Sequence, residues 1–176
     1  TIFGNKVQNL RYGENPHQKS SLYISDYDDQ SLGLKQLNGK ELSFNNYNDI
    51  FAGLEILSSL EKEPTTVIIK HANPCGVAQN KSALTSFKNA YDSDPISAFG
   101  GVIACNFRIN KKIAQEISKN FLEVILAKSF DNKAMKILKK KKNLRVIDIS
   151  KFKIKNLLTT KSFNNSFLIQ SKDELI

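Results

Sequence analysis

Short apolar runs alternate with longer segments of helical periodicity, and this alternation is the strongest constraint that the sequence places on the fold. The apolar runs lie at residues 65–70, 101–105, 123–127 and 144–149. Their β-branched composition and short length predict strands buried on both faces. Strands that alternate with helices predict an α/β layered domain with a mostly parallel central sheet.

The intervening segments are expected to form helices. Asn48 and Asp49 are predicted to cap a helix that ends near Lys62. The apolar residues along this helix recur at helical spacing. Further helices are expected over residues 81–91 and 132–140, and from a cap at Asn110 to about residue 119.

The two ends of the chain carry weaker signals. Residues 1–46 have few periodic runs and are interpreted as a loop-rich segment with one strand near 21–24, followed by a single lobe over residues 47–176. Two further strand candidates lie at 154–158 and 167–170. The start at Thr1 without a methionine indicates an excised segment.

Charge and composition limit the classes of protein that fit. No apolar run approaches the roughly 20 residues that span a bilayer, so no membrane partner is expected. The net charge of +9 fits either a polyanion-binding surface or an enzyme for anionic metabolites. The lysine run 139–142 lacks interleaved aromatic residues, which favours a solvated helix end over nucleic-acid binding.

The two cysteines, Cys75 and Cys105, are too few for a disulfide scaffold and favour a reducing cytoplasm. Cys75 is interpreted as a small buried residue, with a thiol nucleophile as the alternative. Cysteine and histidine spacings also fail to match a zinc site, because Asn73 stands where zinc deaminases need glutamate and no Cys-x-x-Cys follows. No metal is therefore expected.

The sharpest polar cluster, KHANPCG at residues 70–76, follows directly after a predicted buried strand. Open α/β sheets place ligands at the carboxyl ends of their strands, and Asn73-Pro74 predicts a turn there. His71 has the chemistry of a general base, and Lys70 can hold a phosphate or stabilise an oxyanion. The alternative for His71 is a histidine bonded into a loop. Successive strand residues point to opposite faces, so Lys70 and His71 share a site only if the strand ends there.

Other polar strings are weaker singly, but their order along the chain is informative. They are LRYGENPHQ at 10–18, NGK at 38–40, LSFNN at 42–46, KHANPCG at 70–76, SAFGG at 97–101 and EVILA at 123–127. Together they closely resemble the formyltransferase part of the bifunctional family AICAR transformylase/inosine monophosphate cyclohydrolase, where AICAR is 5-aminoimidazole-4-carboxamide ribonucleotide. The resemblance runs from about residue 7 to residue 173.

The resemblance implies a reaction and a site. The family formylates the 5-amine of AICAR with 10-formyltetrahydrofolate as co-substrate, and a separate domain then closes the purine ring. His71 would be the base, and Lys70 would stabilise the charge that develops on the formyl oxygen or help orient the groups in transfer. The positions expected to bind AICAR are Arg11, Tyr12, Asn46, Gly100 and Glu123.

The resemblance also implies a cytidine-deaminase-like lobe without zinc, the first of two, with the folate bound mainly by the second. The family forms homodimers. This chain alone is expected to be inactive or nearly so. Two departures from the family pattern, Lys128 after the strand at 123–127 and the turn at 163–170, put local loop conformations in question. The alternatives are a non-catalytic nucleotide-binding module and a basic nucleic-acid-binding domain.

Overall fold

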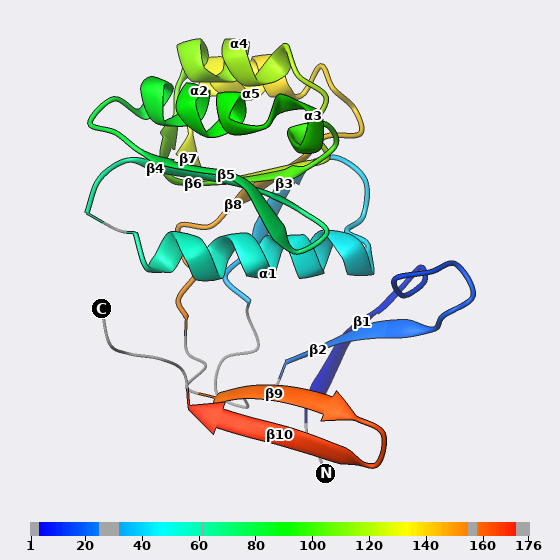
Figure 1. The fold of residues 1–176 in the computed structure, drawn as a ribbon. Coiled ribbons are helices and arrows are strands. Elements are labelled where there is room, and N and C mark those ends of the chain that lie inside the picture. The colour runs from blue at the N-terminus through cyan, green and yellow to red at the C-terminus, as the bar shows by residue number, and fades with distance from the viewer. Residues whose placement is uncertain (1–3, 25–31, 61, 155–157, 172–176) are drawn as a thin grey trace.

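The computed structural model describes residues 4–24, 32–60, 62–154 and 158–171. A six-stranded sheet in the order β3-β8-β7-β6-β4-β5 forms its centre (Figure 1). The strands are β3 (Lys35–Asn38), β4 (Thr65–Lys70), β5 (Asn73–Gln79), β6 (Val102–Ile109), β7 (Val124–Phe130) and β8 (Arg145–Asp148). Four of them match the predicted apolar runs, which confirms the α/β layered class.

The sheet is mixed in direction. Strands β6, β7 and β8 are parallel to one another, as the alternation with helices predicts. Both flanks are antiparallel, because β4 pairs antiparallel with β5 and β6, and β3 pairs antiparallel with β8. The parallel arrangement therefore holds for the central three strands.

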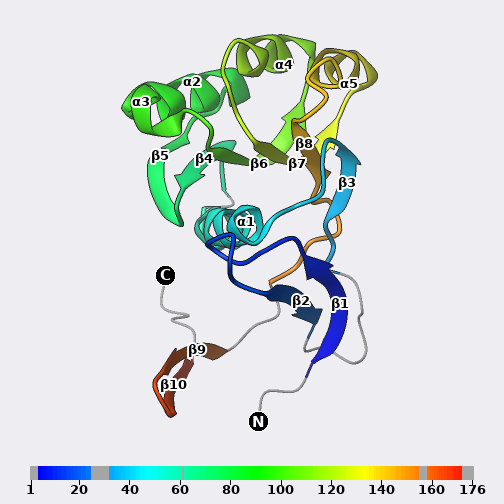
Figure 2. The ribbon, with the colours of Figure 1, turned by 90° about the vertical axis from the view of Figure 1, so that its right-hand side faces the viewer.

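Helices cover both faces of the sheet (Figures 1 and 2). Helix α1 (Phe44–Ser58) lies on one face, whereas α2 (Ala83–Ser93), α4 (Lys111–Ser118) and α5 (Asn132–Leu138) lie on the other. A single turn, α3 (Pro95–Ala98), follows α2. The helix predictions are confirmed in number and approximate place, apart from α3.

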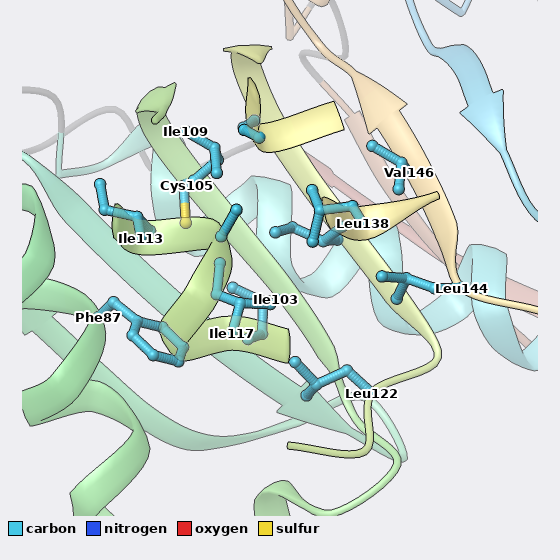
Figure 3. Packing of buried hydrophobic residues seen from close by; sticks show 14 of the residues in the cluster. Phe87, Ile103, Cys105, Ile109, Ile113, Ile117, Leu122, Leu138, Leu144 and Val146 are labelled. Carbon is cyan, nitrogen blue, oxygen red and sulfur yellow. The ribbon is translucent and has the colours of Figure 1, made fainter. Parts of the chain in front are cut away.

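Burial alternates along the strands because successive side chains point to opposite faces. Ile68, Ile103 and Ile125 belong to the core under α2, α4 and α5, part of which Figure 3 shows. Their neighbours, such as Val102 and Val124, belong to the second core under α1. Two-sided burial explains why these runs are continuously apolar rather than alternating.

The start of α1 corrects the predicted cap. The helix begins at Phe44, and Ser43 is its N-cap, with the hydroxyl accepting from the Asn46 N–H. The Asn46 amide in turn accepts from the Ser43 N–H, which completes a capping box. Asn48 and Asp49 therefore lie inside the helix, because the Ser43 box satisfies the first backbone donors a turn earlier.

The first 46 residues hold more strand than the sequence predicts. Strand β2 (Ser20–Ile24) lies where one was expected, but it pairs with β1 (Asn5–Leu10), and β3 adds an edge to the central sheet. These strands are polar and partly exposed, so hydrophobic periodicity does not reveal them.

The last strands form a separate antiparallel hairpin. Strand β9 (Leu158–Phe163) pairs with β10 (Ser166–Ser171), and β10 confirms the candidate at 167–170. Most of the candidate at 154–158 lies outside the described residues. Both small hairpins, β1–β2 and β9–β10, lie on the α1 side of the sheet in the two views (Figures 1 and 2).

Residues 73–79 correct the predicted Asn73-Pro74 turn, since they form the edge strand β5. A proline is tolerated there because an edge strand has a side without ladder partners. The register shifts between Ile68 and Ile69, and Gly76 sits under α2, where a Cβ atom would come within 1.9 Å of the Ala90 carbonyl oxygen. Glycine is therefore required by close packing of helix on strand.

We expect Gly76→Ala to lower the free energy of unfolding by about 3 kcal/mol, because α2 must shift away from β5. Urea denaturation followed by circular dichroism measures the change. Val77→Ala, a partly exposed neighbour on the same strand, is the matched control and should cost less than about 1 kcal/mol. Equal losses in the two variants would contradict the close-contact explanation.

Burial raises the pKa of the Cys105 thiol in β6 to about 12 from an ordinary value of 9.0. The folded chain then keeps this proton while the unfolded chain loses it, so the contribution is complete below about pH 9 and is lost as the pH rises toward 12. We expect the fall in unfolding free energy between pH 9 and 11 to be shallower in Cys105→Ala than in the unaltered chain. Parallel slopes in urea titrations would contradict this.

Candidate active site

Five of the seven predicted site residues come from distant parts of the sequence and gather at one edge of the sheet; they are Asn46, Lys70, His71, Gly100 and Glu123. This edge is formed by the carboxyl end of β4, the amino ends of β6, β7 and β8, and the first turns of α1. In the registers, Ile69 is opposite Val102, and Val102 is opposite Val124. The site therefore lies at the amino ends of the parallel strands. The expectation of a carboxyl-end site holds for β4 alone, because β4 runs antiparallel to β6.

A tight turn between β4 and β5 carries His71. Lys70 pairs with Asn73, so His71 and Ala72 are the only two residues of the loop. Both have positive φ, 54° and 57°, which is the pattern of a type I′ turn. Neither residue is glycine, and such backbone costs of order 1–3 kcal/mol per residue, which folded proteins retain mainly at functional sites.

The turn settles whether Lys70 and His71 are separated by strand alternation. The strand ends at Lys70, so His71 does not continue the pleat. The Lys70 ammonium donates to the Phe99 carbonyl over 2.7 Å, next to Gly100. His71 is exposed and Lys70 is half-buried. The cation is thus held against the loop that leads into β6, and the imidazole is open to solvent.

Gly100 belongs to the same edge. Its φ is 76°, a conformation that favours glycine, and its N–H donates to the Phe121 carbonyl over 2.9 Å. The Phe99 and Phe121 rings lie 4.9 Å apart, which joins the loops before β6 and β7. Residues 99–100 form a turn before β6, and the short helix α3 precedes that turn.

The side chains of Asn46 and Glu123 are joined by a direct hydrogen bond. The Asn46 amide nitrogen donates to Glu123 Oε2 over 3.0 Å, and Asn46 is only 3% exposed. The capping box uses the Asn46 oxygen for Ser43, which orients the nitrogen toward Glu123. The same residue therefore starts the helix and fixes the carboxylate.

Arg145 is a charged neighbour that sequence reasoning missed. Its guanidinium lies 3.7 Å from Glu123 Oε2, and the arginine side chain is 15% exposed. It also donates twice to the Glu41 carbonyl, over 3.2 Å and 3.1 Å. Its place at the start of a strand parallel to β7 is the signal that would have indicated proximity to Glu123.

Asn46 and Arg145 both contact Oε2 of the Glu123 carboxylate. Within the part of the chain that the structure describes, no hydrogen bond or ion pair uses Oε1. That oxygen is suited to accept a hydrogen bond from a ligand hydroxyl or amine. The edge thus combines a cation at Lys70, an imidazole at His71 and a carboxylate acceptor at Glu123.

Arg11 and Tyr12 lie on the loop between β1 and β2. The Arg11 guanidinium stacks over the Tyr12 ring at 5.6 Å, and Arg11 is exposed. The loop touches the start of α1, because Asn45 donates to the Glu14 carbonyl over 3.3 Å. The loop therefore reaches the residue beside Asn46, although no hydrogen bond or ion pair within the described ranges joins Arg11 to Lys70 or His71.

Three further features concern the Cys75 thiol, metal binding and membrane crossing. Burial raises the pKa of the Cys75 thiol, and the Asp94 carboxylate adds to the rise, so the thiol stays protonated near neutrality. Residues 4–24, 32–60, 62–154 and 158–171 contain no cluster of three or more histidine, cysteine or acidic side chains able to hold a metal. The helices in these ranges are also too short or too polar to cross a bilayer.

Comparison with known proteins decides the family. The AICARFT/IMPCHase bienzyme family matches residues 1–176. The chain belongs to this family.

Relatives support the assignment along nearly the whole chain. The bifunctional purine biosynthesis protein PurH of Thermoanaerobacter sp. (strain X514) is 44% identical over 171 residues, which cover 97% of this chain and 33% of that protein. PurH of Leptospira biflexa serovar Patoc (strain Patoc 1 / Ames) is 46% identical over 178 residues, which cover 98% of this chain and 33% of that protein. PurH of Buchnera aphidicola subsp. Schizaphis graminum is 47% identical over 173 residues, which cover 96% of this chain and 33% of that protein. The chain spans about a third of the length of these relatives.

Solved structures are more distant. RibD of Acinetobacter baumannii aligns with a TM-score of 0.45 and 13% identity, over 57% of this chain and 35% of that one. The second form of the same RibD has a TM-score of 0.43 and 13% identity, over 59% of this chain and 36% of that one. Likenesses of this size carry no argument about the site, and the deaminase-like arrangement stays a prediction.

Proposed function

We propose that this chain is the first lobe of an AICAR transformylase and carries the catalytic pair of that enzyme. The observation that carries the proposal is the convergence of Lys70, His71, Gly100 and the Asn46–Glu123 pair at one sheet edge. Family membership and relatives named as bifunctional purine biosynthesis proteins support it. The parent protein would also close the ring as an inosine monophosphate cyclohydrolase.

In the proposed reaction the 5-amine of AICAR attacks the formyl carbon of 10-formyltetrahydrofolate. The amine on this electron-poor imidazole is a weak nucleophile, so His71 takes its proton as the new C–N bond forms. Lys70 stabilises the negative charge that develops on the formyl oxygen. The bond to the folate N10 then breaks, and the tetrahydrofolate amine leaves with a proton.

Substrate binding is assigned to the residues around this pair. Glu123 Oε1 accepts from the nucleotide, Asn46 holds the carboxylate in place, and the Gly100 loop lets the backbone approach closely. Arg11, beside Tyr12, is suited to the AICAR phosphate because a guanidinium fork matches phosphate oxygens. The remaining folate contacts belong to a second lobe, and the proposal includes a homodimer in the reducing cytoplasm, where Cys75 and Cys105 stay free.

His71→Asn tests the proposed base. Asparagine tolerates positive φ, so this change removes the imidazole while keeping the turn. The assay uses a chimera in which residues 1–176 replace the matching third of the Thermoanaerobacter relative. We expect transformylase kcat to fall by about 10²–10⁴-fold.

The 176-residue chain alone should show no turnover in the same assay. Unchanged kcat in His71→Asn would contradict the catalytic role and favour a non-catalytic nucleotide-binding module. The urea denaturation midpoint of His71→Asn in the 176-residue chain serves as the control for correct folding, because ring closure belongs to a separate domain.

Arg11→Ala tests phosphate recognition. Calorimetric titration of AICAR into this chain should give binding that the phosphate-free riboside lacks, and that Arg11→Ala weakens about tenfold or more. Arg108→Ala, an exposed arginine on the far half of β6, is the matched control and should leave the affinity unchanged. Equal weakening in both variants would indicate a general charge effect instead.

A further inference from the structure

The peptide that joins His71 to Ala72 is held at both of its polar ends. The Ala72 N–H donates to Asp49 Oδ1 over 2.7 Å, and the His71 carbonyl accepts from the Asn73 amide nitrogen over 2.8 Å. In a two-residue turn the flanking residues pair with each other, which leaves this central peptide without a ladder partner. The side chains of Asp49 and Asn73 therefore supply the hydrogen-bond partners that the sheet does not give this peptide.

The orientation of this peptide decides the shape of the turn. If it rotated by half a turn, Ala72 would pass to negative φ and the loop would become type II′, which needs positive φ only at its first central residue. Negative φ suits alanine better than positive φ, whereas the first central position of a type II′ turn suits glycine and not histidine, so the two turns compete. The side-chain hydrogen bonds to the central peptide favour the observed orientation.

Asp49 is suited to this purpose. It lies in the second turn of α1, whose cap is Ser43, so its carboxylate is not used for capping. Its bond to the Ala72 N–H is charge-assisted and joins residues 23 positions apart in sequence. Because α1 also carries Asn46, one helix aligns both the His71 turn and the Glu123 carboxylate.

We propose that Asp49 and Asn73 are positioning residues, which lock the His71–Ala72 peptide so that the imidazole is held in one place for proton transfer. We call the two hydrogen bonds that hold this peptide the lock. The catalytic part of this inference rests on the proposed function, whereas the lock is a property of the turn. Loss of the lock leaves His71 present but free to move with a flipped peptide, and small misplacements of a catalytic group are costly.

The lock is tested in this chain by nuclear magnetic resonance. In Asp49→Ala, HN–Hα couplings and residual dipolar couplings of Ala72 should show loss of the single positive-φ state. Asp49→Asn should keep it, because an amide oxygen still accepts from the Ala72 N–H. Asn48→Ala, an exposed neighbour on the same helix, is the matched control. Positive φ retained at Ala72 in both Asp49→Ala and Asn73→Ala would overturn the lock.

The kinetic consequence is tested in the chimera described above. We expect Asp49→Ala to lower transformylase kcat by about 10–100-fold with the KM for AICAR within about twofold, and Asp49→Asn to recover most of the loss. In Asp49→Ala with Ala72→Gly, glycine removes the resistance to positive φ, so part of kcat should return even without the carboxylate.

The outcomes separate the two proposals. Normal kcat in Asp49→Ala, alongside a severe loss in His71→Asn, would overturn the positioning role and leave the proposed function intact. Normal kcat in His71→Asn would contradict the proposed function. The resonance data would still test whether Asp49 and Asn73 hold the His71–Ala72 peptide. A lower urea denaturation midpoint of Asp49→Ala in this chain would mark a folding defect, and absence of glycine rescue would then overturn positioning.

Discussion

Burial of both faces of β4, β6, β7 and β8 is the constraint on which the rest of the structure depends. The apolar strands need a cover on each side, and α1 supplies one while α2, α4 and α5 supply the other. Removing apolar surface from water is the dominant favourable term in folding. Because this term holds the strands in register, the polar loops at their ends are presented as a fixed set.

Helix α1 links this core to the chemistry of the edge. Its inward face carries Ile50 and Leu54 into the sheet, and its first turns carry Asn46 and Asp49 toward the loops. Rotation of the helix would expose the apolar side chains, so packing fixes the direction of the polar ones. The carboxylate of Glu123 and the turn of His71 are thereby aligned by the same element.

Much of the fold could be predicted, and the failures have physical causes. The buried strands were found because two-sided burial leaves a continuous apolar signal, as in TTVIIK at 65–70. Strand β5 was missed because its Asn73-Pro74 pair has the composition of a turn, and only an edge position makes a proline acceptable there. The cap was placed too late because the Ser43–Asn46 box has no glutamate or glutamine at its third position.

By itself, the sequence determined the α/β class, the positions of the four buried strands, the family resemblance and the seven predicted site residues. These depend on local composition and on motifs that can be read in order along the chain. Only the tertiary structure decided that β4 runs antiparallel to β6, that Arg145 lies beside Glu123, and that Asp49 reaches the Ala72 N–H. Such contacts arise from packing between segments distant in sequence, and local periodicity carries no record of which distant segment a side chain will meet.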